Sequence, residues 1–346
     1  MVGVGGIGGC ASGILAEAGY SVHAVTTNTE LLEALKQNGC EVKGLREPLN
    51  ISLNVSQTPP VDSLYDYILL ATRPMQVEEA AQHAKQHLKP DGRMVVFQNG
   101  LCESRVASIV GEEKVIGGIV AWGASKCQPG VYEKTSSGGF SLGTIDGSTD
   151  PRLTTLSTIL ECIGPTKITT NLLGARWSKL ALNSAISSLG TIGGDRLGTL
   201  VRVRRYRRLA LHIFTEAVAV AKAANISVEK ISGTIDLNWG ALTEKELKLT
   251  LGSASLTAKH ALLLGVGLRY RKLRSSMLSA IERGRKPDID FLNGEIVSHG
   301  KTHGINTPIN AAIVDKVWKL AEGTAKPGKT HLDELASLAI QQTDNP

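Results

Sequence analysis

The stretch MVGVGGIGG, residues 1–9, decides the fold of this chain. Within it, Gly3, Gly5 and Gly8 form the pattern G-x-G-x-x-G. In a dinucleotide-binding loop the first glycine makes the tight turn after a strand, the second lets backbone approach a pyrophosphate, and the third lets the next helix pack close to the sheet. The N-terminus of that helix then presents unpaired N–H groups to the phosphates. The residues that we predict to bind a cofactor here are Gly3, Gly5, Gly6, Ile7 and Gly8.

The residues around this pattern favour a dinucleotide loop over a flexible glycine-rich N-terminus. Residues 10–18 continue as a helix of small and apolar side chains, and Gly19 stands where a helix-ending glycine is expected. Residues 20–25 then predict a second strand. Only Met1 and Val2 precede Gly3, so the first strand is predicted to be almost absent.

The bulk composition is that of a soluble globular protein with two domains. The 346 residues are 42% hydrophobic and 20% charged, and no apolar run approaches the ~18 residues that span a bilayer. The five cysteines are widely spread without a C-x-x-C pair, which is typical of a reducing compartment and of no disulfide framework. No basic segment precedes the apolar start, so we predict a cytoplasmic protein without a signal peptide or a membrane partner.

The net charge of +6 comes partly from one local run of arginines. Such a run more often covers the solvated face and start of a helix than a nucleic-acid surface, so we predict no nucleic-acid partner. A basic surface also attracts anionic substrates such as carboxylates and nucleotide phosphates. The run consists of Arg202, Arg204, Arg205, Arg207 and Arg208.

Other chemistries lack their motifs in this sequence. Two histidine pairs have the spacing i, i+4, but neither belongs to an H-E-x-x-H arrangement, so we predict no metal site. Ser275-Ser276 has no nucleophile-elbow glycines, and no G-x-x-x-x-G-K-[ST] loop is present. The histidine pairs are His83 with His87 and His299 with His303.

The predicted secondary structure changes near residue 171, from alternating strands and helices to helices. Before it, short apolar runs at 22–25, 67–71, 93–98, 115–120, 140–145 and 165–169 predict strands, with helices at 30–38 and 77–88. Strands that alternate with helices imply a mostly parallel sheet. After it, helical periodicity predominates at 176–188, 205–224, 255–264, 276–283, 290–303 and 308–322, with an irregular insertion at 229–252. We therefore predict an α/β domain at 1–170, a helical domain at 171–325 and a tail with one amphipathic helix at 326–346.

The end of the second strand indicates the cofactor. NAD-binding folds usually place an acid there to hold the ribose 2′-hydroxyl, whereas this strand ends in Thr26, Thr27 and Asn28. Arg73 follows the strand at 67–71, and its guanidinium is suited to a 2′-phosphate, although an ordinary surface arginine is the alternative. We therefore predict NADP(H) rather than NAD, with Asn28 and Arg73 near the cofactor.

The helix WSKLALNSAIS, residues 177–187, is the candidate for catalysis. Lys179, Asn183 and Ser187 are spaced i, i+4, i+8 and share one helix face. A ketone that accepts a hydride needs a group that protonates its oxygen as charge develops, and an inward-facing lysine is suited to that task. A solvated stripe on an amphipathic helix explains the spacing equally well.

Larger blocks of sequence resemble the ketopantoate reductase (2-dehydropantoate 2-reductase) family from Gly3 to about Val317. The blocks are GVGGIG, QNG at 98–100, WSKLALN at 177–183, RSSMLSAIERGRKPDIDFLNGE at 274–295 and HGINTPIN at 303–310. The resemblance implies a Rossmann domain followed by an all-α domain of the 6-phosphogluconate-dehydrogenase-like type. It also implies NADPH-dependent reduction of a 2-keto acid, ketopantoate to pantoate in pantothenate biosynthesis.

The resemblance implies a role for each matching residue of the helical half. Lys179 matches the general acid that protonates the substrate C2 oxygen, and Asn183 matches an asparagine that hydrogen-bonds the substrate. Ser276 matches the serine that contacts the substrate carboxylate. Asp288 matches a position, usually Glu, that binds substrate hydroxyls.

In the α/β half, Asn99 matches an asparagine near nicotinamide and substrate, and Arg73 matches a basic residue at the 2′-phosphate. Ser187 stands where the family often has a second asparagine at the substrate, and Asp288 is one methylene shorter than Glu. Asn28 replaces a common arginine, which removes one phosphate contact.

Two other functions stay open. One is a related NADP-dependent 2-keto or 3-hydroxy acid dehydrogenase with a different substrate. The other is a non-catalytic NADP-sensing binding protein, against which the presence of both Lys179 and Asn183 argues. Apolar helices in the second half are consistent with a homodimer.

Overall fold

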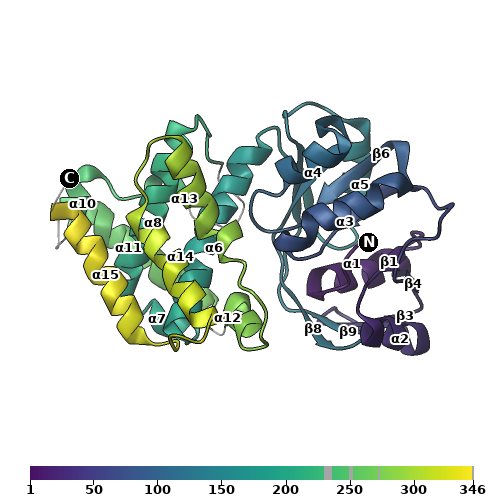
Figure 1. Ribbon diagram of the computed structural model, residues 1–346, viewed down its shortest axis with the longest axis horizontal. Coiled ribbons are helices and arrows are strands. Elements are labelled where there is room, and N and C mark those ends of the chain that lie inside the picture. The colour runs from purple at the N-terminus through teal and green to yellow at the C-terminus, as the bar shows by residue number, and fades with distance from the viewer. Residues whose placement is uncertain (230–235, 249–251, 272, 345–346) are drawn as a thin grey trace. The chain divides into compact units, whose positions relative to one another are not determined.

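The computed structural model describes residues 1–229, 236–248, 252–271 and 273–344 of the chain. It divides into two compact units, Met1–Leu172 and Leu173–Pro346, each of which is described by itself (Figure 1). The first unit contains the strands and the second is helical (Figure 1). The predicted α/β domain followed by an all-α domain is confirmed.

The main sheet of the first unit is mostly parallel, as predicted. Its strand order is β4-β1, then the bridge residue Val2, then β5-β6-β7-β10-β11. All pairs up to β7 are parallel, β10 runs antiparallel to β7, and β11 is parallel to β10. The bounds are β1 His23–Val25, β4 Asn54–Ser56, β5 Tyr65–Leu70, β6 Leu88–Val96, β7 Val115–Val120, β10 Phe140–Thr144 and β11 Thr166–Ile168.

Val2 takes the place of the first strand, which the sequence predicted to be almost absent. It forms parallel bridges to both Val25 and Leu70. The Val2 N–H donates to the Leu69 carbonyl, and the Val2 carbonyl accepts from the Ala71 N–H, each at 2.8 Å. A single residue therefore joins β1 to β5 and places Gly3 at the carboxyl edge of the sheet.

Five α-helices accompany the strands of this unit. The helix predicted at 77–88 ends earlier, at Ala84, and β6 begins at Leu88 rather than at residue 93. A 3₁₀ turn at Lys85–His87 connects the two elements. The bounds are α1 Gly6–Glu17, α2 Thr29–Asn38, α3 Val77–Ala84, α4 Glu103–Val110 and α5 Pro151–Leu160.

A second, four-stranded sheet was not predicted from the sequence. Its order is β3-β2-β9-β8, and it packs against α1. Its strands have only three to five residues and β8 is largely exposed, so the apolar alternation in β2 and β3 is limited to two apolar positions in each strand. The bounds are β2 Cys40–Lys43, β3 Leu49–Ile51, β8 Ala124–Gln128 and β9 Val131–Lys134.

In the second unit, the helices α9, α11, α13, α14 and α15 pack on α8, Arg204–Ala223, and the longest helix of the described residues is α6, Leu172–Gly193. The segment predicted as an insertion contains the short helices α9 and α10, while 230–235 and 249–251 lie outside the described residues. The helix α15 packs on α8 and α14 through Leu332, Leu335, Ala336 and Ala339. Other bounds are α7 Leu197–Leu200, α9 Leu237–Gly240, α10 Glu244–Lys248, α11 Ala254–Arg269, α12 Ser276–Ile281, α13 Asn293–Thr302, α14 Pro308–Ala321 and α15 Lys329–Asp344.

Candidate active site

The first and third glycines of the loop are required by the packing. Gly3 has φ +92°, and a Cβ there would lie 2.7 Å from the Thr72 nitrogen at the end of β5. A Cβ on Gly8 would collide with the Gly3 carbonyl oxygen and approach the Ala71 methyl. The loop therefore makes its turn against β5, and α1 lies directly on that turn because neither position carries a side chain.

The second glycine is different, because Gly5 has open space around it. No atom lies within 4 Å of the position that a Cβ would take. Gly5 is also the N-cap of α1, and no side chain caps that helix end. The exposed backbone at a helix N-terminus is the arrangement that receives a pyrophosphate, so the loop fits a dinucleotide.

The loop lies at the point where the strand order of the parallel sheet reverses. Val2 is followed in the chain by β1 on one side, while β5 pairs with it on the other. In open α/β sheets ligands bind outside the carboxyl ends of the strands at such a switch point. Asn28, Arg73 and Asn99 follow β1, β5 and β6, so the predicted cofactor residues of this unit share the loop's edge.

A hydrogen bond that the sequence did not predict joins two of these strand ends. The Gln98 Nε2 donates to the Thr72 Oγ1 at 3.1 Å. This bond links the residues that follow β6 to those that follow β5. Asn99 is exposed, and the backbone turns at Gly100, where φ is +91°. Gln98 belongs to the QNG block, but no local signal marks Thr72 as its partner.

Asn28 caps the helix that follows β1. Its Oδ1 accepts the Leu31 N–H at 2.7 Å, so the side-chain NH₂ group is the part that a ligand can reach. An NH₂ group donates hydrogen bonds and therefore suits a phosphate or a hydroxyl. The first acid beyond the strand is Glu30, in the first turn of α2.

Two cysteine thiols near the loop are expected to be unreactive. Cys10 on α1 and Cys40 on β2 are fully buried, and burial raises the pKa of each to about 12. A thiol is a poor nucleophile when its pKa is this high. These two cysteines therefore serve packing rather than redox or covalent chemistry.

In the second unit, α6 is oriented by its tryptophan. Trp177 is fully buried, its Nε1 donates to the Ala217 carbonyl of α8 at 2.8 Å, and its ring meets His299 edge-on at 5.2 Å. Another face of the continuous helix carries Lys179, Asn183 and Ser187, all half-buried. These three residues form the polar row of α6.

Hydrogen bonds connect the start of α12 to the Ser187 end of this row. Ser275 is the N-cap of α12. Its hydroxyl oxygen lies 2.7 Å from the Thr191 hydroxyl oxygen, and the hydroxyl donates to the Ser187 carbonyl at 3.2 Å. The exposed Ser276 is thereby held next to the Ser187 end of the row. Sequence reasoning singled out Ser276 and missed Ser275, whose partners lie more than 80 residues away.

Asp288 lies on the connection between α12 and α13. It is half-buried and precedes a 3₁₀ turn at Ile289–Phe291. The row on α6 and the start of α12 are brought together by direct contacts, while Asp288 is placed by this separate turn. A carboxylate there is a hydrogen-bond acceptor for a hydroxyl.

The described residues contain no group of three or more metal-ligating side chains that could hold an ion. His299 and His303 stack at 6.4 Å between ring centroids, and His299 lies 3.9 Å from the Glu295 carboxylate. In the same residues, no helix combines the length and the apolar character needed to cross a bilayer.

A glycine loop at the switch point of a parallel sheet, followed by a helical unit with a polar row, defines a two-domain dinucleotide-dependent oxidoreductase. The family described as Ketopantoate reductase PanE/ApbA matches residues 1–147, and its C-terminal domain matches residues 171–321. The chain therefore belongs to the ketopantoate reductase family.

Relatives across the family align over nearly the whole chain. The 2-dehydropantoate 2-reductase of Pyrococcus horikoshii is 26% identical over 331 residues, covering 95% of this chain and 97% of its own. The PanE/ApbA family ketopantoate reductase of Ralstonia eutropha JMP134 superposes with a TM-score of 0.78 at 22% identity, over 93% of this chain and 99% of its own. A D-mandelate dehydrogenase bound to NADH and anilino(oxo)acetate has a TM-score of 0.77 at 20% identity with the same coverage. At such identities the structural likeness concerns the fold.

Proposed function

We propose that this chain reduces a 2-keto acid to a 2-hydroxy acid with NADPH, and that its substrate is ketopantoate, which becomes pantoate in pantothenate biosynthesis. The observation that carries the proposal is the half-buried polar row of α6, on a helix anchored by Trp177, with α12 hydrogen-bonded to the end of the row. The family relatives named 2-dehydropantoate 2-reductase support the same substrate. A cytoplasmic location fits the five cysteines, which form no disulfide bond.

Each residue of the helical unit has a defined task in this proposal. When bound, the nicotinamide supplies the hydride for the keto carbon. The Lys179 ammonium donates a proton to the oxygen as negative charge develops on it. Asn183 hydrogen-bonds the same end of the substrate, and Ser276 donates to its carboxylate. Asp288 accepts the hydrogen bond of a distal hydroxyl.

The preference for NADPH rests on the ends of β1 and β5. No carboxylate occupies residues 26–28 to repel a 2′-phosphate, and the NH₂ group of Asn28 is a donor. Arg73 supplies the charge that a phosphate requires. Asn99, exposed at the end of β6, is proposed to contact the nicotinamide end.

The test is a steady-state comparison of substrates and cofactors. We expect kcat/KM with NADPH to exceed that with NADH by at least about tenfold, the equivalent of one charge-assisted hydrogen bond. We expect ketopantoate to be preferred over 3,3-dimethyl-2-oxobutanoate, which lacks only the distal hydroxyl, and Asp288→Ala to remove that preference. Equal rates for the two keto acids would refute the role of Asp288.

A second candidate function is favoured by the short side chains at two substrate positions. Ser187 and Asp288 reach less far than the Asn and Glu that are usual in the family, which suits a bulkier 2-keto acid or a 3-hydroxy acid. Rapid reduction of phenylglyoxylate without reduction of ketopantoate would select this alternative. Tight NADPH binding without turnover of any keto acid would select a sensing protein.

We also propose a homodimer that uses an exposed face of α11. Leu262 and Leu268 are 39% and 58% exposed there, beside the exposed small residues Ala258, Ala261 and Gly265. Sedimentation equilibrium is expected to give a dimer mass, and Leu268→Lys is expected to shift it toward the monomer. A monomer at all protein concentrations would contradict the proposal.

A further inference from the structure

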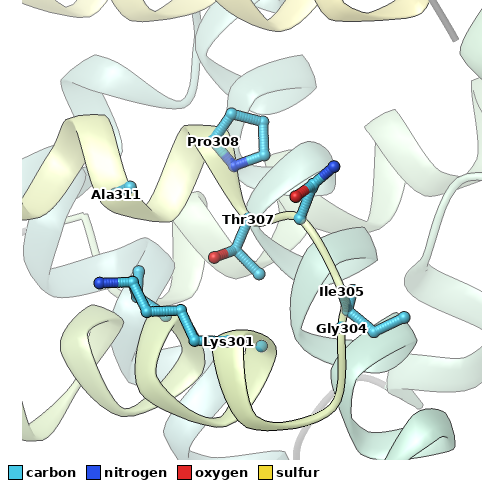
Figure 2. Close-up of a pocket in the computed structure, with 9 residues that line it drawn as sticks. Lys301, Gly304, Ile305, Thr307, Pro308 and Ala311 are labelled. Carbon is cyan, nitrogen blue, oxygen red and sulfur yellow. The ribbon is translucent and has the colours of Figure 1, made fainter.

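An open cavity of about 460 Å³ lies on the surface between the end of α13 and the start of α14. Figure 2 shows Lys301 and the hydroxyl of Thr307 on the same side of it, below Pro308. Its apolar wall is formed by Val297, Ile305, Pro308 and Ala311, and its polar groups are Lys301, Asn306 and Thr307.

Thr307 occupies the N-cap of α14 without capping it. An N-cap threonine normally accepts an N–H from the first helical turn, but this side chain makes no such bond. The Glu216 carboxylate on α8 takes that place, accepting the N–H of Ile309 at 2.8 Å and that of Asn310 at 2.9 Å. The Thr307 residue is only 7% exposed, and its hydroxyl finds no hydrogen-bond partner in the described part of the chain.

The loop that carries these groups is held in shape before any ligand arrives. Gly304 turns the chain after α13 at φ +70°. A Cβ on Gly300 would lie 2.8 Å from the Ile305 carbonyl and 2.9 Å from the Thr307 methyl, so only glycine lets residues 305–307 rest on α13. A site that is already formed loses little conformational entropy on binding.

The positive charge of Lys301 indicates that the cavity binds an anionic ligand. Lys301 is the one charged side chain among the lining residues, all of which are described, and it forms no ion pair within the described chain. The Glu216 carboxylate is occupied by the α14 N–H groups. An ammonium, a hydroxyl and an amide beside an aliphatic wall match an anionic head with a short apolar body.

We propose that this cavity is a binding site for a small aliphatic carboxylate, separate from the polar row of α6. The carboxylate lies between the Lys301 ammonium and the Thr307 hydroxyl. The aliphatic body contacts Val297, Ile305 and Ala311. The site does not depend on the proposed reductase activity, because its test measures binding alone.

The experiment is a calorimetric titration of the full chain with isobutyrate, which has no keto group, with isobutyramide as the neutral control. We expect isobutyrate to bind and isobutyramide not to bind. Lys301→Met is expected to weaken isobutyrate about tenfold, the value of one charge-assisted hydrogen bond. Lys319→Met, which removes an exposed lysine of α14 paired with Asp315, is the matched control and is expected to bind as the wild type does.

Two further measurements locate the ligand. Thr307→Val is expected to weaken binding without lowering the melting temperature, because the hydroxyl does not cap α14, and Thr307→Ser is expected to restore binding. Isobutyrate is expected to shift the Ile305 and Ala311 methyl signals in NMR spectra and to bind Lys179→Met normally. Unchanged affinity in Lys301→Met, or loss of binding in Lys179→Met, would overturn the proposal.

Discussion

The helices α1 and α6 carry the candidate functional residues of the first and of the second unit, and they are built in opposite ways. In α1 the important feature is the absence of side chains: Gly8 lies against the Gly3 carbonyl, Gly9 against the Tyr132 ring, and Gly5 faces open space. In α6 the important feature is three polar side chains on one face of a helix held by Trp177. We therefore expect added atoms in the first helix, and removed atoms in the second, to impair function.

The largest expected effect comes from removing atoms from α6. Lys179→Ala is expected to lower kcat by about 10²–10⁴-fold, the range for loss of a general acid, while the dissociation constant for NADPH stays unchanged. Stopped-flow rates and NADPH fluorescence titration measure the two quantities. Lys222→Ala, an exposed lysine of the same unit, is the control and is expected to have wild-type kcat. Wild-type turnover in Lys179→Ala would exclude the role of this amine.

Adding atoms to α1 is expected to have two distinct results. Gly8→Ala forces a methyl into the Gly3 carbonyl and is expected to destabilise the first unit by about 1–3 kcal/mol. Gly5→Ala meets no protein atom, so it is expected to leave the melting temperature unchanged and to weaken NADPH by about tenfold or more. Unaltered NADPH affinity in Gly5→Ala would show that the loop does not receive the pyrophosphate.

Acid is expected to act on the helical unit through buried histidines. Burial, together with nearby arginines, lowers the pKa of His212 and of His260 to about 4. In the unfolded chain these histidines bind a proton near pH 6.5, whereas in the folded chain they do so only near pH 4. The free energy of unfolding is therefore unaffected by these groups above pH 6.5 and decreases as the pH falls toward 4, by up to roughly 3 kcal/mol per histidine.

Chemical denaturation as a function of pH tests this expectation. His260→Gln is expected to flatten the decline between pH 6.5 and 4, whereas His303→Gln, at an exposed position, is the control and is expected to leave it unchanged. A further loss is expected below pH 4.5. Burial opposes ionisation of Glu246, but bonds from Lys259 and the Thr243 N–H outweigh it and lower its pKa to about 2. An identical pH profile in His260→Gln would contradict this account.

The smallest expected effect separates two neighbouring serines. Ser275→Ala removes the N-cap of α12 and its bonds to α6, so it is expected to cost about 1 kcal/mol of stability. Ser276→Ala removes an exposed hydroxyl and is expected to raise the KM for the keto acid without changing stability. The opposite assignment of the two effects in melting and kinetic assays would refute the placement of Ser276 at the substrate.

Local patterns predicted the features that depend on local geometry. The glycine spacing predicted the loop, because the turn and the start of α1 are made by residues close in sequence: Gly8 packs on the Gly3 carbonyl. The i, i+4, i+8 spacing predicted the shared face of Lys179, Asn183 and Ser187, because helical geometry alone determines it. The parallel sheet followed from alternating strands and helices.

Features that depend on distant partners escaped sequence reasoning. Ser275 acquires its role from Thr191, 84 residues away, and the N-terminus of α14 is capped by Glu216, 93 residues from Ile309. The strand β8 is short and largely exposed, and β2 buries only Cys40 and Val42. Both strands are stabilised by packing on α1, a contact that no local pattern predicts. Residue roles at the substrate came from the family resemblance and stay predictions.

The most direct test of the central claim is a product assay with the unmodified protein. NADPH and ketopantoate are incubated with it, and pantoate is measured by chromatography beside the loss of nicotinamide absorbance. The account predicts one pantoate formed for each NADPH consumed. NADPH that binds tightly but is not consumed with ketopantoate or with any other 2-keto acid would contradict it.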